Sequence, residues 1–376
     1  MNQSPATLIH STKRSTLCEK VTRGAVVTAV HWGGGSPTML KPDDMRDLMS
    51  HLRSAFNFSP DAEISIEMDP NDLDDARFDA LADIGMTRAS LGVQDFADEV
   101  QKAINRPQSF EQTKAVVDAV RARGVSSVNC DILYGLPYQT LDSIAQTIRL
   151  ILSLSPDRIA LFGYAHVPWM KKHQTMINED ALPNTDERYA QMNLAGKMLI
   201  EAGYQAIGID HFAKPGDSLA LAAKSGQLAR NFQGYTTDRS TALIGLGASS
   251  ISQFPQGYMQ NMPATGEYQK LVDAGHLAGI RGVELTDEDR ARAWLICEIM
   301  CFRPINLKLL EKRFGTIGSR LTVEIREFVA RDVDGLSSLN LDDFSLSPIG
   351  MPYARLVAAA FDAYLNTGRG RHSAAV

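Results

Sequence analysis

Two charged side chains of opposite sign could together recognise a small zwitterionic molecule. The Glu67 carboxylate can accept hydrogen bonds from an ammonium group, and the Arg106 guanidinium can hold a carboxylate through two parallel hydrogen bonds. Gln94 and Asp131 follow in two further polar stretches and could contact hydroxyl or amine groups, although Asp131 could equally cap a helix. Two unrelated surface charges would explain Glu67 and Arg106 as well, so the pair alone leaves both interpretations open.

Three consecutive glycines, Gly33, Gly34 and Gly35, directly follow an apolar stretch that we expect to be a strand. Without Cβ atoms, their backbone can approach a ligand within hydrogen-bond distance. The spacing matches neither the dinucleotide fingerprint nor the phosphate-binding loop. A tight turn without a ligand is an equally good explanation of the glycines alone.

The cysteines and histidines do not form a pattern typical of metal sites. The chain has four cysteines, too few for a disulfide framework, which predicts a reducing compartment such as the cytoplasm. Cys297 and Cys301 share one face of an expected helix, where buried core cysteines are favoured over metal ligands. The histidines lack zinc-type spacing. We therefore assign no metal ligand and no catalytic residue.

Strand and helix patterns alternate through most of the chain, which predicts a parallel sheet with crossover helices. Glycines at 85, 124 and 203 are expected to end helical runs. Such a sheet either winds in two directions or curls into a barrel. The expected strands lie near 26–32, 63–67, 88–93, 126–133, 158–164, 204–210 and 242–251.

Polar clusters at the strand ends favour the curled sheet, because the carboxyl ends of its strands face one mouth. We interpret the clusters as a shared ligand cup rather than as ordinary turns. They comprise Gly33–Ser36, Glu67 and Asp69, Gln94 and Asp95, Asn129 and Asp131, Tyr164–His166, and Asp210–His211.

The pattern changes after about residue 280. Thr286 is expected to cap a helix at 286–302, and further helices are expected at 306–315, 320–331 and 351–365, with a hairpin at 336–346 between the last two. We expect this region to pack over the cup. The predicted organisation is therefore an atypical, disordered leader at 1–25, a partial β/α barrel at 26–280, and a mainly helical domain at 281–376.

Composition excludes some classes of protein. The chain of 376 residues has 38 basic and 44 acidic side chains, a net charge of −6, which argues against a nucleic-acid protein built on a basic face. No apolar run approaches the ~20 residues of a membrane span.

Several motifs together are far more specific than any one of them. They are HWGGGSPT at 31–38, EISIEMDP at 63–70, GVQDF at 92–96, NR at 105–106, DILYGLP at 131–137, YAHVP at 164–168 and RNFQGYTT at 230–237. This set resembles the oxygen-independent coproporphyrinogen III oxidases, radical S-adenosylmethionine enzymes of haem synthesis. The stretches at 94–96 and 231–237 resemble the oxidases more than the related haem-chaperone branch.

The resemblance implies a fold, a cofactor and a substrate. It implies a curled partial barrel with a C-terminal lid domain, S-adenosylmethionine at the barrel mouth, a coproporphyrinogen III substrate, an electron donor, and a cytoplasmic monomer. Ser36 stands where threonine is usual. The cofactor contacts implied by the resemblance fall on Gly34, Gly35, Ser36, Glu67, Gln94, Arg106, Asp131, Ala165 and Ile251.

The chain departs from the family at the iron–sulfur motif. The family carries Cys-x-x-x-Cys-x-x-Cys before the glycine run, where three thiolates hold a [4Fe-4S] cluster. Here Cys18 is the only cysteine before Gly33, so we expect that the first family segment is missing. Without that segment, the strand at 26–32 would have an unpaired edge, which favours self-association.

Three interpretations therefore remain: the oxidase, a cluster-free binding protein, and a remnant without activity. The oxidase converts two propionates of coproporphyrinogen III to vinyl groups and gives protoporphyrinogen IX. The alternative is a cluster-free protein that binds S-adenosylmethionine or a tetrapyrrole without radical chemistry. The cysteine positions predict that no stable cluster assembles on this chain.

Overall fold

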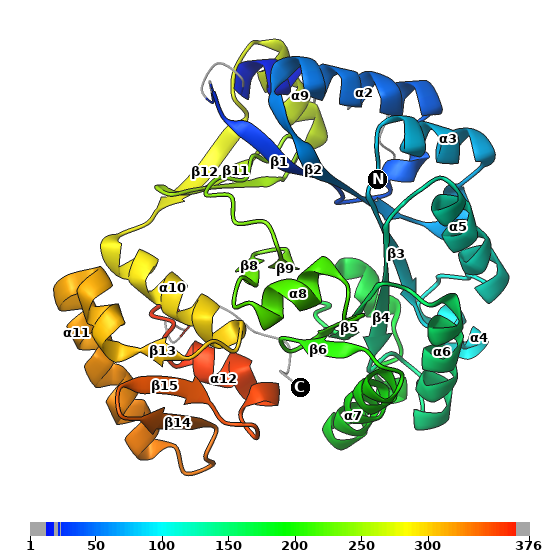
Figure 1. Cartoon of the computed structure of the whole chain (residues 1–376). Coiled ribbons are helices and arrows are strands. Elements are labelled where there is room, and N and C mark those ends of the chain that lie inside the picture. The colour runs from blue at the N-terminus through cyan, green and yellow to red at the C-terminus, as the bar shows by residue number, and fades with distance from the viewer. Residues whose placement is uncertain (1–12, 19–21, 23, 366–376) are drawn as a thin grey trace. The chain divides into compact units, whose positions relative to one another are not determined.

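The computed structural model describes residues 13–18, 22 and 24–365, which form two units (Figure 1). The first unit contains the chain up to Tyr204 together with Ser240–Val283. The second contains Gln205–Arg239 and, of the described residues, 284–365. Residues 205–239 thus group with the C-terminal region, and the domain boundaries given above stay predictions.

A curled parallel sheet forms the centre of the first unit (Figure 1). Its strands are β1 (Val26–Trp32), β2 (Asn57–Met68), β3 (Arg88–Gln94), β4 (Ser127–Tyr134) and β5 (Arg158–Gly163). They lie side by side in sequence order, whereas a doubly wound sheet reverses its order at a switch point. The predicted partial β/α barrel is confirmed.

Crossover helices join these strands. They are α2 (Pro42–Ala55), α3 (Asp75–Asp83), α4 (Asp98–Ala103), α5 (Phe110–Ala122) and α6 (Leu141–Leu154), and α7 (Thr185–Glu201) follows β5. Gly85, Gly124 and Gly203 follow α3, α5 and α7 with φ of 82°, 84° and 91°. These left-handed values confirm the predicted helix ends.

The two faces of the sheet differ in chemistry. Strand side chains alternate in direction, and every second one, such as Ile66, Leu91 and Ile132, is fully buried. The opposite face is polar: Glu67 is in register with Ser90, which is in register with Asn129. The alternation of apolar and polar residues along the strands thus produces one apolar face, which packs against the helices, and one polar face, which is available to ligands.

A second, smaller sheet completes the first unit. It contains β10 (Ile251–Phe254), β11 (Gly257–Asn261) and β12 (Gly279–Glu284), with α9 (Thr265–Asp273) between the last two. The strand predicted at 242–251 is wrong: only Ile251 belongs to a strand, and Leu243 forms an isolated bridge with Gln253. Gly245 and Gly247 lie in irregular backbone, and the Asn261 amide donates to both of their carbonyls at 3.0 and 2.8 Å.

Part of the predicted leader is helical. Residues 13–18 form a helical turn in which the Arg14 side chain is buried and its Nε donates to the Gly245 carbonyl at 3.2 Å. Lys13 forms an ion pair with Asp273 on α9. Residues 1–12, 19–21 and 23 lie outside the described residues.

The second unit combines short hairpins with helices. Its elements are β6 (Gln205–Ile207), β7 (His211–Ala213), α8 (Ser218–Lys224), β8 (Ala229–Asn231), β9 (Gly234–Thr236), α10 (Asp287–Met300), β13 (Ile305–Asn306), α11 (Leu307–Arg331), β14 (Ser337–Asn340), β15 (Asp343–Leu346) and α12 (Ala354–Ala359). The strand predicted at 204–210 is shorter, because a turn at Gly208 with φ 59° reverses the chain into an antiparallel hairpin.

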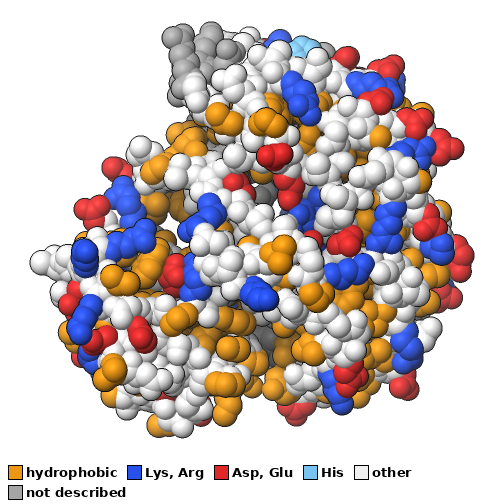
Figure 2. Space-filling model, in the orientation of Figure 1, with side chains coloured by type: hydrophobic (Ala, Val, Ile, Leu, Met, Phe, Trp, Pro, Cys, Tyr) orange, Lys and Arg blue, Asp and Glu red, His pale blue; other side chains and the backbone are white. Residues whose placement is uncertain are grey.

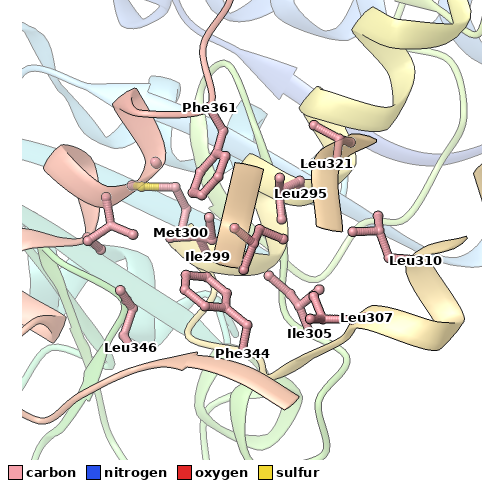
Figure 3. Packing of buried hydrophobic residues seen from close by; sticks show 14 of the residues in the cluster. Leu295, Ile299, Met300, Ile305, Leu307, Leu310, Leu321, Phe344, Leu346 and Phe361 are labelled. Carbon is pink, nitrogen blue, oxygen red and sulfur yellow. The ribbon is translucent and has the colours of Figure 1, made fainter. Parts of the chain in front are cut away.

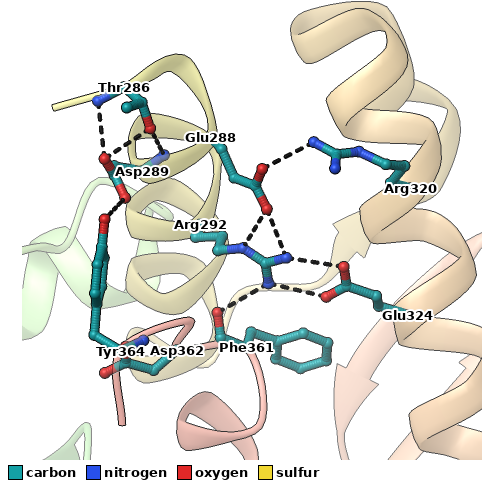
Figure 4. Close-up of polar contacts among 9 residues, drawn as sticks. All are labelled: Thr286, Glu288, Asp289, Arg292, Arg320, Glu324, Phe361, Asp362 and Tyr364. Carbon is teal, nitrogen blue, oxygen red and sulfur yellow. Dashed lines mark hydrogen bonds and ion pairs between the residues drawn. The ribbon is translucent and has the colours of Figure 1, made fainter. Parts of the chain in front are cut away.

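Several predictions for the C-terminal region are confirmed. Thr286 caps α10 through a capping box with Asp289 (Figure 4). The two helices predicted at 306–315 and 320–331 form α11, which is kinked at Gly315 with φ 58°. β14 and β15 form the predicted hairpin. Leu295 and Ile299 of α10 pack with Phe344 and Phe361 in the core of this unit (Figure 3).

Charge and hydropathy agree with the composition argument. Basic and acidic side chains are interspersed on the face shown in Figure 2, with no basic stripe there. Within the described part of the chain, every helix is too short or too polar to cross a bilayer.

Candidate functional site

The glycine turn after β1 lies beside the Glu67 carboxylate at the end of β2. The Gly34 amide donates to Glu67 Oε2 at 3.2 Å. Gly34 has φ 79°, and a Cβ placed on it would meet no atom within 4 Å, so its backbone borders open space. A Cβ on Gly33 would instead lie 2.8 Å from the Glu67 carboxyl carbon. The absence of a side chain at Gly33 thus allows the Glu67 carboxylate to approach the backbone. The absence of a side chain at Gly34 leaves open space beside that carboxylate.

His31 holds the other oxygen of this carboxylate. Its Nε2 lies 3.3 Å from Glu67 Oε1, and its Nδ1 lies 2.8 Å from the Ser65 hydroxyl. The contact with His31 is the main cause that lowers the pKa of Glu67, and the Gly34 amide adds to it. Glu67 is therefore ionised at neutral pH and ready to accept a cation.

Arg106 reaches the same edge of the sheet from the segment after α4. Its terminal nitrogen donates to Asp69 Oδ2 at 3.3 Å. Its Nε is buried and has no hydrogen-bond partner among the described residues. A buried donor without a partner is costly, and a ligand oxygen would satisfy it.

Gln94 and Asp131 complete this polar surface. A Cβ on Gly92 would lie 3.0 Å from the Gln94 amide nitrogen and 3.2 Å from an Arg106 nitrogen, so both side chains lie over this glycine. Gly92 is in register with Asp131, which accepts from the Asn129 amide at 2.8 Å. Asp131 lies inside β4, so the helix-cap alternative is wrong.

The remaining predicted contacts lie on other elements of the first unit. Gly35 is exposed, and Ser36 precedes a short 3-10 helix at Pro37–Met39. Ala165 follows β5, and its carbonyl accepts from the Gln174 amide at 3.0 Å. Ile251 begins β10 on the smaller sheet and is partly exposed. The structure thus joins Gly34 to Glu67 by a hydrogen bond and places Gln94 and Arg106 over the same glycine, Gly92.

Asp95 does not belong to the ligand cup. It is fully buried, accepts from the Ala97 amide and the Gln139 side chain at 2.6 Å each, and burial raises its pKa. Its role is to hold the turn before α4. Asp210 and His211 lie in the second unit, where one Asp210 oxygen lies 2.6 Å from His211 Nδ1 and the other pairs with Arg355 at 3.0 Å.

Sequence reasoning missed two contributors to the site, His31 and Gln174. His31 contacts Glu67, while Asp69, already placed in the cup by the sequence, pairs with Arg106. Strand alternation could have indicated His31, which lies on the same face as Glu67. Gln174, which fixes the backbone at Ala165, sits in a loop without periodicity.

These residues fit S-adenosylmethionine. Its methionyl group carries an ammonium and a carboxylate, which match the Glu67 carboxylate and the partnerless Arg106 Nε. The open space at Gly34 admits a close approach to the backbone. The assignment of Glu67 and Arg106 to a zwitterion site stays a prediction.

The cysteines do not fit a [4Fe-4S] cluster, which needs three converging thiolates. Cys130 is fully buried within β4, and desolvation strongly raises its pKa. Burial also raises the pKa of Cys18 in the N-terminal helical turn. Cys297 and Cys301 belong to α10 and its end in the second unit. No three of these thiols share a loop.

Known proteins show the same architecture and sequence. A family model described as the radical SAM superfamily matches residues 17–151. The oxygen-independent coproporphyrinogen III oxidase of Cereibacter sphaeroides is 46% identical over 94% of this chain and 78% of its own length. That of Pseudomonas aeruginosa is 40% identical over 92% of this chain and 76% of its own length.

A solved structure agrees with these relatives. The coproporphyrinogen III oxidase of Escherichia coli, described as a radical SAM enzyme, superposes with a TM-score of 0.92 at 36% identity. The match covers 96% of this chain and 83% of that one. The chain therefore belongs to the oxygen-independent coproporphyrinogen III oxidase family of radical S-adenosylmethionine enzymes.

Proposed function

We propose that this chain binds S-adenosylmethionine at the carboxyl edge of β1–β5 and takes coproporphyrinogen III as its substrate, in the manner for which the family is named. The observation that carries the proposal is the grouping of the Gly34 backbone, the ionised Glu67 and the partnerless Arg106 Nε on one sheet edge. The proposal keeps the cytoplasmic location expected from the cysteine content.

Each residue has a role that follows from its geometry. Glu67, held by His31 and Gly34, accepts from the methionyl ammonium. Arg106 donates to the methionyl carboxylate from Nε, while Asp69 holds its terminal nitrogen. Gln94 and Asp131 bind hydroxyl or amine groups of the cofactor. Ala165 and Ile251 are further proposed contacts.

The oxidase reaction has a defined balance. Each of two propionates becomes a vinyl group and loses carbon dioxide, one proton and two electrons. Bound S-adenosylmethionine with a reduced cluster supplies the hydrogen-abstracting radical in this family. Because the thiols of this chain do not fit the cluster, we derive no step through it.

A second candidate function rests on that disagreement. A protein that binds S-adenosylmethionine or a tetrapyrrole without radical chemistry needs the cup but not the thiolates. The separate, buried positions of Cys18 and Cys130 favour this candidate.

Calorimetry tests the cofactor site. We expect Glu67→Gln and Arg106→Ala each to weaken S-adenosylmethionine binding by about 1–3 kcal/mol, the cost of a lost charged hydrogen bond. Wild-type affinity itself is expected to be low without an iron to chelate the methionyl group. Arg46→Ala is a matched control, because Arg46 is similarly exposed and pairs with Asp83 outside the cup. Equal affinity in wild type and both site variants would end the assignment.

Anaerobic reconstitution with iron and sulfide separates the two candidates. We expect no stable cluster, no 5′-deoxyadenosine and no vinyl product on reduction. A stoichiometric [4Fe-4S] signal that disappears in Cys18→Ala would restore the oxidase for this chain. It would mean that other ligands complete the site.

A further inference from the structure

The loop after β5 exposes apolar side chains beside basic ones. Trp169, Met170 and Met176 are 48%, 69% and 78% exposed. Lys171 and Lys172 lie between them and are exposed as well. Neither lysine forms an ion pair with a carboxylate in the described residues. Large exposed apolar groups close together commonly mark a binding surface.

This loop has a fixed backbone. The buried Gln174 donates to the Ala165 carbonyl at 3.0 Å and accepts from the Val167 amide at 2.6 Å. The amides of Met170 and Lys171 both donate to the Val167 carbonyl, at 2.8 and 2.9 Å. Trp169 therefore lies within a hydrogen-bonded turn. The backbone conformation of this turn keeps the Trp169 side chain exposed.

The loop is continuous with the proposed cofactor site. Ala165, a proposed cofactor contact, is the residue that Gln174 holds. Because β5 is parallel to β2, β3 and β4, the loop leaves the same edge of the sheet that carries Glu67 and Gln94.

The charges of this loop indicate which class of ligand it can bind. Two unpaired lysines beside an indole and two thioethers suit a molecule that combines apolar rings with carboxylates. The exposed Glu179 carboxylate lies 3.0 Å from His166 Nε2, and within the described part of the chain it forms no ion pair with Lys171 or Lys172. Anionic apolar ligands therefore match the surface better than cationic ones.

We infer that Trp169, Met170, Lys171 and Lys172 form a docking surface for the tetrapyrrole, an inference that rests on the proposed function. The indole and the Met170 thioether pack against pyrrole rings. The two lysines bind propionate carboxylates. Gln174 is a positioning residue that fixes the loop in the docking conformation.

Fluorescence titration tests this surface with coproporphyrin III, the stable oxidised form that carries the same propionates. Porphyrin bound near Trp169 quenches its emission. We expect Trp169→Ser to weaken binding about tenfold and Trp169→Phe to retain most of it, with absorbance titration replacing the lost signal. We expect Lys171→Gln with Lys172→Gln to weaken binding about fivefold at low salt, and less at high salt.

Matched controls and a second ligand isolate the effect. Val333→Ser changes an exposed apolar residue and Lys197→Gln an exposed lysine elsewhere, and both should leave porphyrin binding unchanged. S-adenosylmethionine affinity, measured by calorimetry, should be the same in the loop variants and wild type.

Other outcomes overturn the inference. Porphyrin binding that Trp169→Ser leaves intact would refute the docking surface, even if S-adenosylmethionine binds. Binding of Trp169 to phosphatidylglycerol vesicles without competition from porphyrin would assign the surface to lipid instead. Failure of wild type to bind S-adenosylmethionine would refute the proposed function, while tryptophan-dependent porphyrin binding would still support the surface.

Discussion

Arg106 in the first unit and Arg292 in the second are both partly shielded from water, but their guanidinium groups are used differently. Arg292 on α10 donates to Glu288, to Glu324 and to the Phe361 carbonyl through bonds of 2.9–3.2 Å (Figure 4). Arg106 makes one bond of 3.3 Å to Asp69 and keeps a buried Nε without a partner in the described chain.

The difference distinguishes a structural arginine from a binding one. Arg292 joins α10 to α11 and to the segment after α12. Its hydrogen bonds are all made to groups of the protein itself. The main cause that raises its pKa is the bond to Glu324. Arg106 carries unused hydrogen-bonding capacity at its buried Nε. Loss of Arg292 should therefore cost stability, and loss of Arg106 should cost affinity.

The largest effect is expected for Arg292→Met. We expect the free energy of unfolding to fall by about 2–4 kcal/mol, because Glu288, Glu324 and the Phe361 carbonyl each lose a charged donor. Urea denaturation followed by circular dichroism measures it. Arg331→Met is the control, since Arg331 is 78% exposed and pairs with Glu327 within one helix, so its loss should cost under about 0.5 kcal/mol. Equal losses of unfolding free energy in Arg292→Met and Arg331→Met would show that Arg292 has no special structural role.

The next effect concerns Arg106→Met. We expect S-adenosylmethionine affinity to fall by about 1–3 kcal/mol, while the free energy of unfolding changes by less than about 0.5 kcal/mol. Asp69 still accepts from the Asn71 amide and side chain at 3.0 Å each, so no charge is left without a partner. A stability loss as large as that of Arg292→Met would make Arg106 structural.

The fold of the first unit could be predicted because local pattern and tertiary structure agree there. Strands β1 to β5 are apolar runs bounded by glycine or polar residues, and the same alternation places Glu67 and Asp131 on the ligand face. The stretch 242–250 has apolar residues but bends at its glycines, so its composition predicted a strand wrongly.

The parts that could not be predicted depend on distant contacts. Asp95 directly follows Gln94 at the end of β3, but it is buried, with φ of 69° at Gln94 and a hydrogen bond from the Gln139 side chain. The partnerless Nε of Arg106 is a property of the folded surroundings. The hydrogen bonds of Gln174 to the backbone of Ala165 and Val167 hold a loop whose sequence has no repeating pattern.

A smaller effect is expected for Gly34→Ala, where backbone strain and ligand binding can be measured separately. Alanine at a left-handed glycine costs about 1 kcal/mol of stability. Gly34 and Gly124 have φ of 79° and 84°, and neither would place a Cβ near another atom. We expect both alanine variants to lose similar stability in urea denaturation. Only Gly34→Ala should also weaken S-adenosylmethionine binding, because its methyl group fills the space beside Glu67.

The smallest effect is a pH dependence at Glu67. Its pKa is lowered from the ordinary 4.5, chiefly by the hydrogen bond with His31. A lowered pKa in the folded state stabilises the protein above the unfolded value, and the stabilisation is lost as pH falls through the folded value. The difference in unfolding free energy between wild type and Glu67→Gln should therefore be greater at pH 6 than at about pH 3. Urea denaturation at the two pH values measures it, with the exposed Glu111→Gln as control. A difference that grows as pH falls would show that the His31 contact favours the protonated carboxyl, and Glu67 would then be unsuited to hold an ammonium group.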